Sequence, residues 1–259
     1  MDFSSRHFYA LLFSLTVLVS SSAFAQNKGF TFRQAAQDLT EKIKAETGVE
    51  ITYKDLPALQ SSHLSFEFAS AADYPALLQF MAILRKELAL YPKAFWSKFS
   101  HPRIALVKKH FFHEKPAEGM FPATADILLL DFFRSRNNSM AQRHSIHHEI
   151  FHWIDYHLNG PTMGEDKKWQ ALNAAGFKYS QELGEQKRQV LDPRNPPAKG
   201  FVTDYAMTLA AEDKAEVFAC LMIPAQNKLL SRWAKTDEIL RKKIEAIKYL
   251  VSEFCGGLF

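Results

Sequence analysis

The stretch over residues 147–157 carries three side chains whose types and spacing can hold a metal ion and use it. His148 and His152 are four positions apart, so on a helix both imidazoles lie on one face and can converge on one ion. Glu149 is rotated by about 100° from His148, close enough to reach a zinc-bound water without being a ligand. This HExxH pattern predicts a zinc site in which Glu149 is the general base that activates the water.

A helix is expected over residues 140–157, directly after an apolar strand over residues 126–133. The side of this helix away from the ligand pair is apolar, with Ile146, Ile150, Trp153 and Ile154. A helix with an apolar back and a His/Glu front is expected inside a protein, where it presents that front. The alternative is a helix that contains two histidines and a glutamate by chance, and the apolar surroundings count against it.

Four further polar residues lie on or near this helix. Asp155 shares the face of the two histidines but lies too far along the axis to bind the ion together with His148. We expect it to hydrogen-bond a ligand histidine, directly or through neighbouring groups, unless it is only a polar residue at the helix end. His144, one turn before His148, is an alternative ligand. His147 and His157 fall off the ligand face and are expected to pack or to face solvent.

The third ligand must come from elsewhere in the chain. The extended motif HExxHxxGxxH would need glycine at position 155 and histidine at position 158, but the chain has Asp155 and Leu158. A glutamate from a later helix is the other common arrangement.

The helix expected over residues 208–222 supplies such glutamates. Glu212 and Glu216 are four positions apart on one face, and small residues beside them would let this helix approach the first one closely: Ala211, Ala215 and Ala219. The alternative is that these glutamates belong to a solvated acidic surface, but the apolar residues on either side of them argue against it. Tyr205, seven positions before Glu212, can donate a hydrogen bond to a developing oxyanion, or it can be a core tyrosine.

The chain resembles the lethal-factor-like, gluzincin-type branch of the zincin metallopeptidases, close to a family of bacterial zinc-binding metallopeptidases. The resemblance spans about residues 84–222. The matching residues are His148-Glu149-x-x-His152-x-x-Asp155 and Phe201-x-x-x-Tyr205-x6-Glu212-x3-Glu216-x-Phe218-Ala219, with further matches at Trp169-x-x-Leu172-Asn173, Gly176-Phe177-x-Tyr179 and Tyr91-Pro92-Lys93.

This resemblance implies roles for the later residues. Glu212 would be the third zinc ligand, Glu216 would support the site without binding the metal, and Tyr205 would stabilise the oxyanion. It also implies one Zn²⁺ per chain and a zincin-like catalytic domain, with a small twisted sheet, an active-site helix and a mainly helical C-terminal part.

The remaining pattern indicates an α+β fold. We expect one catalytic domain over residues 26–259, with an α/β lobe over about 26–158 and a helical lobe over about 159–259. Gly48 and Pro92 each end a helix, and a Pro-rich stretch over 192–197 forms a surface loop. The other expected elements are helices over residues 31–46, 71–90 and 236–253 and strands over residues 49–53 and 103–108.

The first 25 residues form an expected export signal. Arg6 and His7 precede an apolar run over residues 8–19, and Ala23-Phe24-Ala25 is a small-x-small cleavage site. A retained membrane anchor is the alternative, but the run is shorter than the roughly 20 residues that a spanning helix needs. We therefore expect an exported protein, periplasmic or secreted, without a membrane anchor after cleavage.

The composition argues against other classes of protein. The 259-residue chain is 47% hydrophobic, which suits a globular core, and its net charge of +4 comes from scattered Lys and Arg. Without a long basic run, nucleic-acid binding is not expected. Cys220 and Cys255 could pair in an oxidising compartment, although the apolar stretch around Cys220 suits a buried free thiol equally well.

The sequence thus predicts a secreted zinc metallopeptidase, an endopeptidase acting on peptide or protein substrates. One alternative is a catalytically silent zinc-binding periplasmic protein, which need not keep Glu149 or Tyr205. Another is a structural protein with an incidental HExxH. Because Glu149 and Tyr205 are both present, the sequence favours the enzyme.

Overall fold

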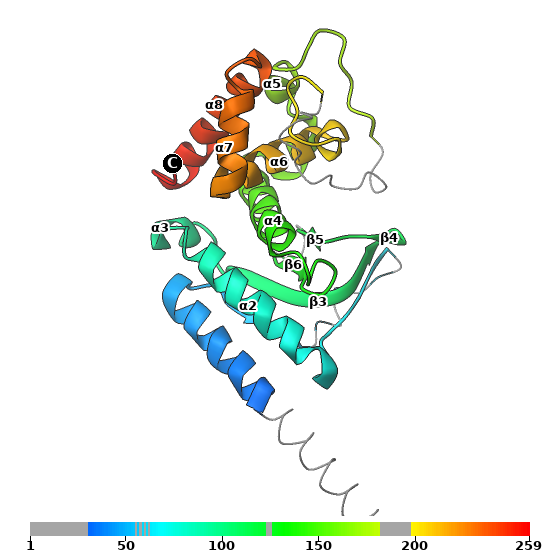
Figure 1. The fold of residues 1–259 in the computed structure, drawn as a ribbon, viewed down its shortest axis with the longest axis vertical. Helices are drawn as coiled ribbons and strands as arrows, with labels where there is room; N and C mark the ends of the chain where they lie inside the picture. Colours follow the sequence, from blue (N-terminus) through cyan, green and yellow to red (C-terminus); the bar gives the residue numbers. More distant parts are fainter. Residues whose placement is uncertain are drawn as a thin grey trace, which may run out of the picture.

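The computed structural model describes residues 31–54, 56, 59, 61, 63–122, 126–181 and 198–259. The expected export signal and the Pro-rich stretch over residues 192–197 lie outside them. A small sheet with its covering helices occupies one half of the described molecule, and a group of helices occupies the other (Figure 1). Helix α4 (Ser139–Asn159) lies between these two halves.

The first two helices form where the apolar spacing predicts them. One covers residues 31–47 and ends at Gly48, whose φ of +83° suits glycine and whose amide donates to the carbonyl of Lys44 at 2.8 Å. The other, α2 (Tyr74–Leu88), follows a 3-10 turn, η2 (Ala71–Asp73). Its buried residues recur at steps of three and four: Leu77, Phe80, Met81, Leu84 and Leu88. The short α3 (Lys93–Trp96) begins after Pro92.

The sheet is mixed and is built around one long strand, β3. In sheet order the main path is β1-β3-β6-β5, and β2 and β4 also pair with β3. β1 and β6 run parallel to β3, β2 and β4 run antiparallel to it, and β5 runs antiparallel to β6. The strands are β1 (Glu50–Thr52), β2 (Leu64–Glu67), β3 (Arg103–Phe112), β4 (Lys115–Pro116), β5 (Gly119–Met120) and β6 (Leu128–Asp131).

The predicted strands correspond to β1, β3 and β6, whereas β2, β4 and β5 were not predicted. β3 continues to Phe112 and turns back into β4 through His113 and Glu114. Both turn residues have positive φ, 47° and 63°, as a two-residue hairpin loop of the primed type requires. The turn contains no glycine, so the sequence carries no strong signal for this hairpin.

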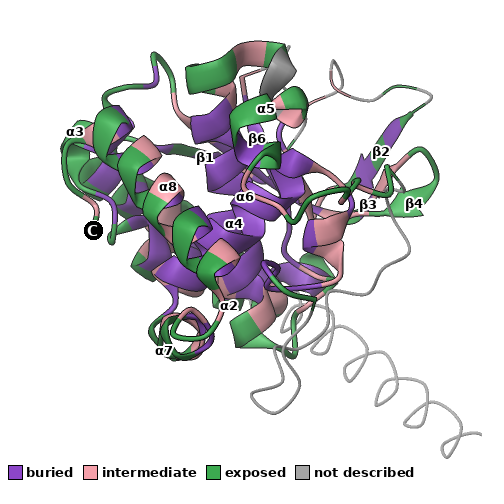
Figure 2. Cartoon of the chain, turned by 90° about the horizontal axis from the view of Figure 1, so that it is seen from above, coloured by how far each residue is buried: buried purple, intermediate pink, exposed green. Residues whose placement is uncertain are grey.

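Helix α4 is the centre of the molecule. The side chain of Asn138 accepts a hydrogen bond from the amide of Ala141 at 3.0 Å and caps its start, and Gly160 with φ of 62° ends it. Nearly every residue between Gln142 and Asp155 is buried, because α2, β5 and β6 contact the helix as well as α6 and α8. Figure 2 shows α4 in purple at the centre, whereas α8 turns a green, exposed face outward.

The C-terminal half is helical, as predicted. α6 packs extensively against α4, and α7, which was not predicted, begins with a proline in its first turn. The elements are η4 (Gly160–Glu165), α5 (Lys167–Gln170), η5 (Tyr205–Met207), α6 (Ala210–Met222), α7 (Pro224–Trp233) and α8 (Glu238–Cys255).

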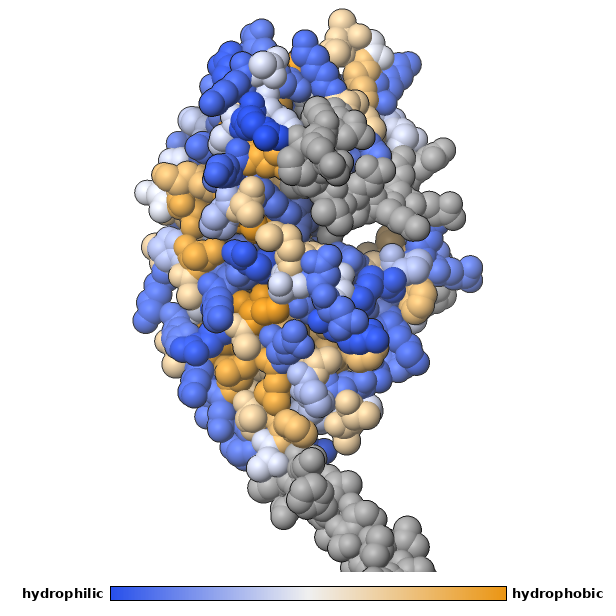
Figure 3. Space-filling view, viewed as in Figure 1, coloured by the Kyte–Doolittle hydropathy of each residue, from blue (hydrophilic) through white to orange (hydrophobic). Residues whose placement is uncertain are grey.

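The α+β fold class is therefore confirmed. One hydrophobic cluster joins the two expected lobes, from Leu77 on α2 to Val251 on α8. Cys220 and Cys255 are free thiols, the first buried and the second half-buried. No helix in the described ranges is long and apolar enough to cross a membrane. The face in Figure 3 is mostly hydrophilic, with apolar residues in small separate groups.

Candidate metal centre

Helices α4 and α6 bring three predicted ligands together. Nε2 of His148 lies 3.0 Å from Nε2 of His152 and 3.0 Å from Oε2 of Glu212. Nε2 of His152 lies 3.3 Å from the same carboxylate oxygen. The three atoms form a nearly equilateral triangle whose side chains come from two helices, 60 or more positions apart in sequence.

The donor set and its spacing suit zinc. A tetrahedral zinc with ligand bonds of about 2.0–2.1 Å places its ligand atoms roughly 3.3 Å apart, which is within a few tenths of an ångström of the observed triangle. Two imidazoles and one carboxylate also leave a fourth position for a water or a substrate, as catalytic zinc sites do. His148, His152 and Glu212 therefore fit a catalytic zinc ion.

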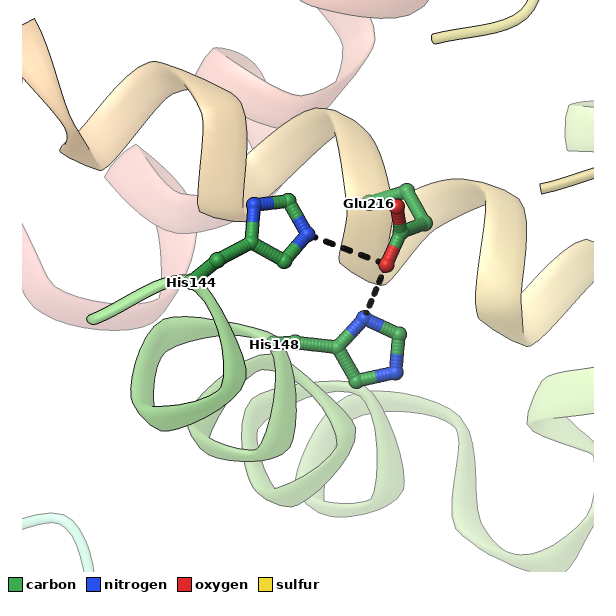
Figure 4. A group of neighbouring side chains, drawn as sticks. All are labelled: His144, His148 and Glu216. Atoms are coloured by element: carbon green, nitrogen blue, oxygen red, sulfur yellow. Dashed lines mark hydrogen bonds and ion pairs between the residues drawn. The ribbon is translucent and has the colours of Figure 1, made fainter. Parts of the chain in front are cut away.

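A second group with metal-ligand chemistry shares His148. Oε1 of Glu216 lies 2.8 Å from Nδ1 of His148 and 3.1 Å from Nε2 of His144 (Figure 4). His144, His148 and Glu216 thus form another candidate zinc site among the described residues. The two groups use opposite nitrogens of the His148 ring.

The two groups differ in what already surrounds them. Glu216 is fully buried, and its second oxygen accepts a hydrogen bond from Thr203 at 2.9 Å. The Nδ1 of His144 contacts Gln226 at 3.0 Å. His152 and Glu212, in contrast, keep 8% and 9% of their surface exposed. His144 keeps 6% of its surface exposed, so the two groups differ in solvent access mainly at the carboxylate, which is partly exposed in Glu212 and fully buried in Glu216.

Charge in the cluster favours a bound cation. Burial lowers the pKa of His152, but nearby carboxylates, Glu212 first among them, outweigh burial and raise that pKa to about 9. Burial raises the pKa of Glu212, yet the two histidines hold it well below its usual value. The carboxylates thus supply a negative field in which a proton, or a metal ion in its place, is stabilised.

Glu149 lies beside this triangle and is nearly buried, with 4% of its surface exposed. Its carboxylate is close enough to His152 to contribute to the raised pKa of that ring. The other side of the Glu149 side chain packs against the backbone of Gly119 on β5. The general base predicted from the motif is therefore held between the candidate ligand group and the sheet.

Tyr205 opens η5 and is half-buried. Its ring centroid lies 6.0 Å from that of His148. The hydroxyl of Thr203 accepts from the amide of Ala206 in the same turn at 3.1 Å and donates to Glu216. Thr203, which the sequence did not single out, thus ties the turn that carries Tyr205 to the carboxylate beside His148.

The comparisons with known proteins agree with this geometry. A family model described as "putative zinc-binding metallo-peptidase" matches residues 122–255, just over half of the chain, including both glutamates and the HExxH helix. The chain belongs to this metallopeptidase family. No curated protein matches it. The crystal structure of a putative zinc-binding metallo-peptidase from Bacteroides caccae ATCC 43185 has the same fold, with 18% identity and a TM-score of 0.51 over 87% of this chain and 85% of that one.

Other residues that match the metallopeptidase family have structural partners. Asp155 binds Lys214, with 2.9 Å from Nζ to Oδ1, and also accepts from Asn159 at 2.7 Å. Nδ1 of His152 has no hydrogen-bond partner among the described residues, so Asp155 acts on that ring through its charge, which contributes to the raised pKa. Asp155 therefore neutralises a fully buried lysine of α6.

Asp213, next to Glu212, accepts hydrogen bonds from two further residues that match the family, Trp169 and Tyr179. Its Oδ2 accepts from the indole of Trp169 at 2.9 Å, the hydroxyl of Tyr179 at 2.7 Å and Nζ of Lys243 at 2.7 Å. These contacts fasten α5, the segment after it and α8 to the helix that carries Glu212. Tyr91 belongs to the Tyr91-Pro92-Lys93 match. Its hydroxyl oxygen lies 2.6 Å from Nδ1 of His147, so Tyr91 packs against α4.

Proposed function

We propose that this chain is an exported zinc endopeptidase in which His148, His152 and Glu212 hold one zinc ion. The observation that carries this proposal is the triangle of ligand atoms at 3.0, 3.0 and 3.3 Å with the buried Glu149 beside it. The membership of the chain in a zinc-binding metallopeptidase family supports it. When bound, zinc would polarise a scissile carbonyl and lower the pKa of a water to roughly 7.

The chain's own residues then supply the proton transfers and the charge stabilisation. Glu149 accepts the proton of the attacking water and passes it to the leaving amine. Tyr205, whose ring centroid lies 6.0 Å from that of His148, donates a hydrogen bond from its hydroxyl to the oxyanion that forms as the carbonyl is attacked. Glu216 faces Nδ1 of His148 and leaves the Nε2 lone pair for the metal.

The substrate is proposed to be an extended peptide. Among the described residues, β5 pairs with β6 on one side only, and it lies next to Glu149. A strand with an unpaired side can bind an extended peptide through main-chain hydrogen bonds. β6, which precedes the metal helix in sequence, is paired on both sides, with β3 and β5, and is closed to such binding.

A zinc-binding protein without turnover is the second candidate, and one observation favours it. The His144–His148–Glu216 group is closed by Gln226 and Thr203, as structural metal sites are closed. In that case the metal would stabilise the packing of α4 on α6, and Glu149 would have no chemical role.

Peptide-end mapping in a complex proteome separates the candidates. Wild type and Glu149→Gln, both loaded with zinc, are incubated with a denatured bacterial proteome, and new peptide N-termini are identified by mass spectrometry. We expect N-termini that wild type produces and Glu149→Gln does not, because Gln cannot act as a base. Equal sets from the two proteins, at equal zinc content, would contradict peptide hydrolysis by this site.

Export is tested separately. Expression of the full chain in a bacterial host, followed by fractionation and N-terminal sequencing, should give a mature protein that begins at Gln26 outside the cytoplasm. A cytoplasmic protein that keeps its first 25 residues would contradict export while leaving the peptidase proposal intact.

A further inference from the structure

The edge strand β5 makes an unusually close contact with the proposed general base. A Cβ built on Gly119 would lie 2.4 Å from Cγ, 2.7 Å from Cδ and 2.9 Å from Oε1 of Glu149. Contacts this short do not occur between real side chains. The Cγ and Cδ atoms of Glu149 occupy the space where any other residue at position 119 would place its side chain.

The backbone at Gly119 does not itself require glycine. Six glycines of the described chain have positive φ, and Gly119 is not among them. Its pairing with Leu130 of β6 is ordinary antiparallel geometry, which other residues adopt. The three atoms nearest to a Cβ at this position all belong to Glu149, so its close approach accounts for the need for glycine.

Glu118, the residue before Gly119, also holds β5 against α4. The carboxylate of Glu118 accepts hydrogen bonds from the hydroxyl of Ser135 at 2.8 Å and from the hydroxyl of Ser145. Ser145 lies one helical turn before Glu149 on α4. The carbonyl of Glu118 also accepts from the amide of Asp131 at 2.8 Å, which continues the β5–β6 pairing. Glu118 and Gly119 thus contact α4 at successive turns.

We propose that Glu118 and Gly119 are positioning residues for Glu149. Glu118 clamps β5 on α4 through Ser145, and Gly119 then presents bare backbone to one side of the Glu149 side chain. That side chain is confined between β5 and the His148–His152–Glu212 group, so its carboxylate stays directed at the place where water is activated. The consequence for turnover rests on the proposed function, but the contact itself can be tested without activity.

The contact is tested first in metal-free protein, by thermal unfolding of a double-mutant cycle. Gly119→Ala should lower the melting temperature by several degrees in the wild-type background, because its methyl group overlaps buried atoms of Glu149. In a Glu149→Ala background, where Cγ and Cδ are missing, the same substitution should have little effect. A loss equal in both backgrounds would overturn the proposed contact. Gly164→Ala is the matched control, because a Cβ there meets nothing within 4 Å.

Turnover is tested in the zinc-loaded protein. Gly119→Ala should retain one zinc and lose about a hundredfold in kcat with little change in KM, as expected for a catalytic group displaced by about 1 Å. If Gly119→Ala, which keeps Glu149, has the same kcat as wild type, the positioning role is overturned. If wild type itself hydrolyses no peptide, the proposed function fails while the stability cycle still decides the contact.

A second pair of variants keeps the proposal testable if Gly119→Ala does not fold. Glu118→Gln keeps an acceptor of the same size for Ser145 and should retain kcat within a fewfold of wild type. Glu118→Ala removes the acceptor for both serines and should lower kcat at least tenfold at full zinc content. Equal kcat values for Gln and Ala at position 118 would overturn the clamp.

Discussion

Oε1 of Glu216 lies 2.8 Å from Nδ1 of His148, on the side of the ring opposite to the nitrogen that faces Glu212. The negative charge of Glu216 beside Nδ1 favours the tautomer that carries its proton on Nδ1, in which Nε2 is a lone-pair donor. Two glutamates one helical turn apart on α6 thus contact the two nitrogens of a single ring. This relationship explains why the two candidate zinc groups share His148.

Glu216→Gln should weaken zinc binding without removing the site. The amide keeps the size of the side chain but loses the charge that orients His148, so we expect about a 10–100-fold rise in the zinc dissociation constant. Competition with a chromophoric chelator measures it. The matched variant Glu212→Gln should lose far more affinity. The reverse ranking would mean that Glu216 is the ligand.

Tyr205→Phe should impair turnover rather than folding. If the hydroxyl binds only the transition state, kcat falls roughly 100–1000-fold while KM, zinc content and melting temperature change little. Steady-state kinetics and thermal unfolding on the same preparation test this. A destabilised but fully active variant would show a core tyrosine instead.

His110 should make the fold sensitive to acid. Neither of its ring nitrogens has a hydrogen-bond partner among the described residues, and burial, aided by Arg134, lowers its pKa to about 4. The unfolded chain binds a proton near pH 6.5, so the stability due to neutral His110 is complete above that pH and is lost as pH falls toward 4. The full difference is on the order of 3 kcal/mol.

Urea unfolding of wild type and His110→Leu at several pH values measures this effect. The variant should lose less stability than wild type between pH 6.5 and 4. The exposed His101→Leu is the control and should follow wild type. Parallel curves for His110→Leu and wild type would contradict the assignment of this acid sensitivity to His110.

Lys243 and Asp213 should show strong energetic coupling. Both side chains are fully buried and lie 2.7 Å apart, so Lys243→Met leaves Asp213 without its cation and should cost about 3–5 kcal/mol. Lys243→Met combined with Asp213→Asn should cost less than the sum of the two single changes, by about 1–3 kcal/mol. Additive values from urea unfolding would mean that this ion pair does not fasten α8 to α6.

The parts of the fold that the sequence predicted are those with a local signal. The HExxH spacing placed His148 and His152 on one helical face, and the apolar periods placed α2, α4, α6 and α8 within a few residues. Glu212 and Glu216 share a face for the same reason. Which of them faces Nε2 of His148 depends on the rotation of α6 against α4, and helical spacing carries no information about that rotation.

The parts that were not predicted depend on contacts between distant segments. β5 has only two residues, and nothing local marks Gly119 as the residue against which Glu149 packs. The same holds for Thr203, which meets Glu216 because η5 folds back on α6. Asp155 was expected beside a ligand histidine, but the buried Lys214, 59 positions away, is a stronger partner for its charge.

Zinc content tests the central assignment most directly, because each candidate group has ligands that the other lacks. His152 belongs only to the group with Glu212, and His144 belongs only to the group with Glu216. We expect His152→Ala, dialysed and analysed by plasma mass spectrometry, to retain well under one zinc per chain. His144→Ala should retain close to one zinc and cleave peptides. The opposite result, with zinc lost from His144→Ala and kept by His152→Ala, would contradict a catalytic zinc at His148, His152 and Glu212.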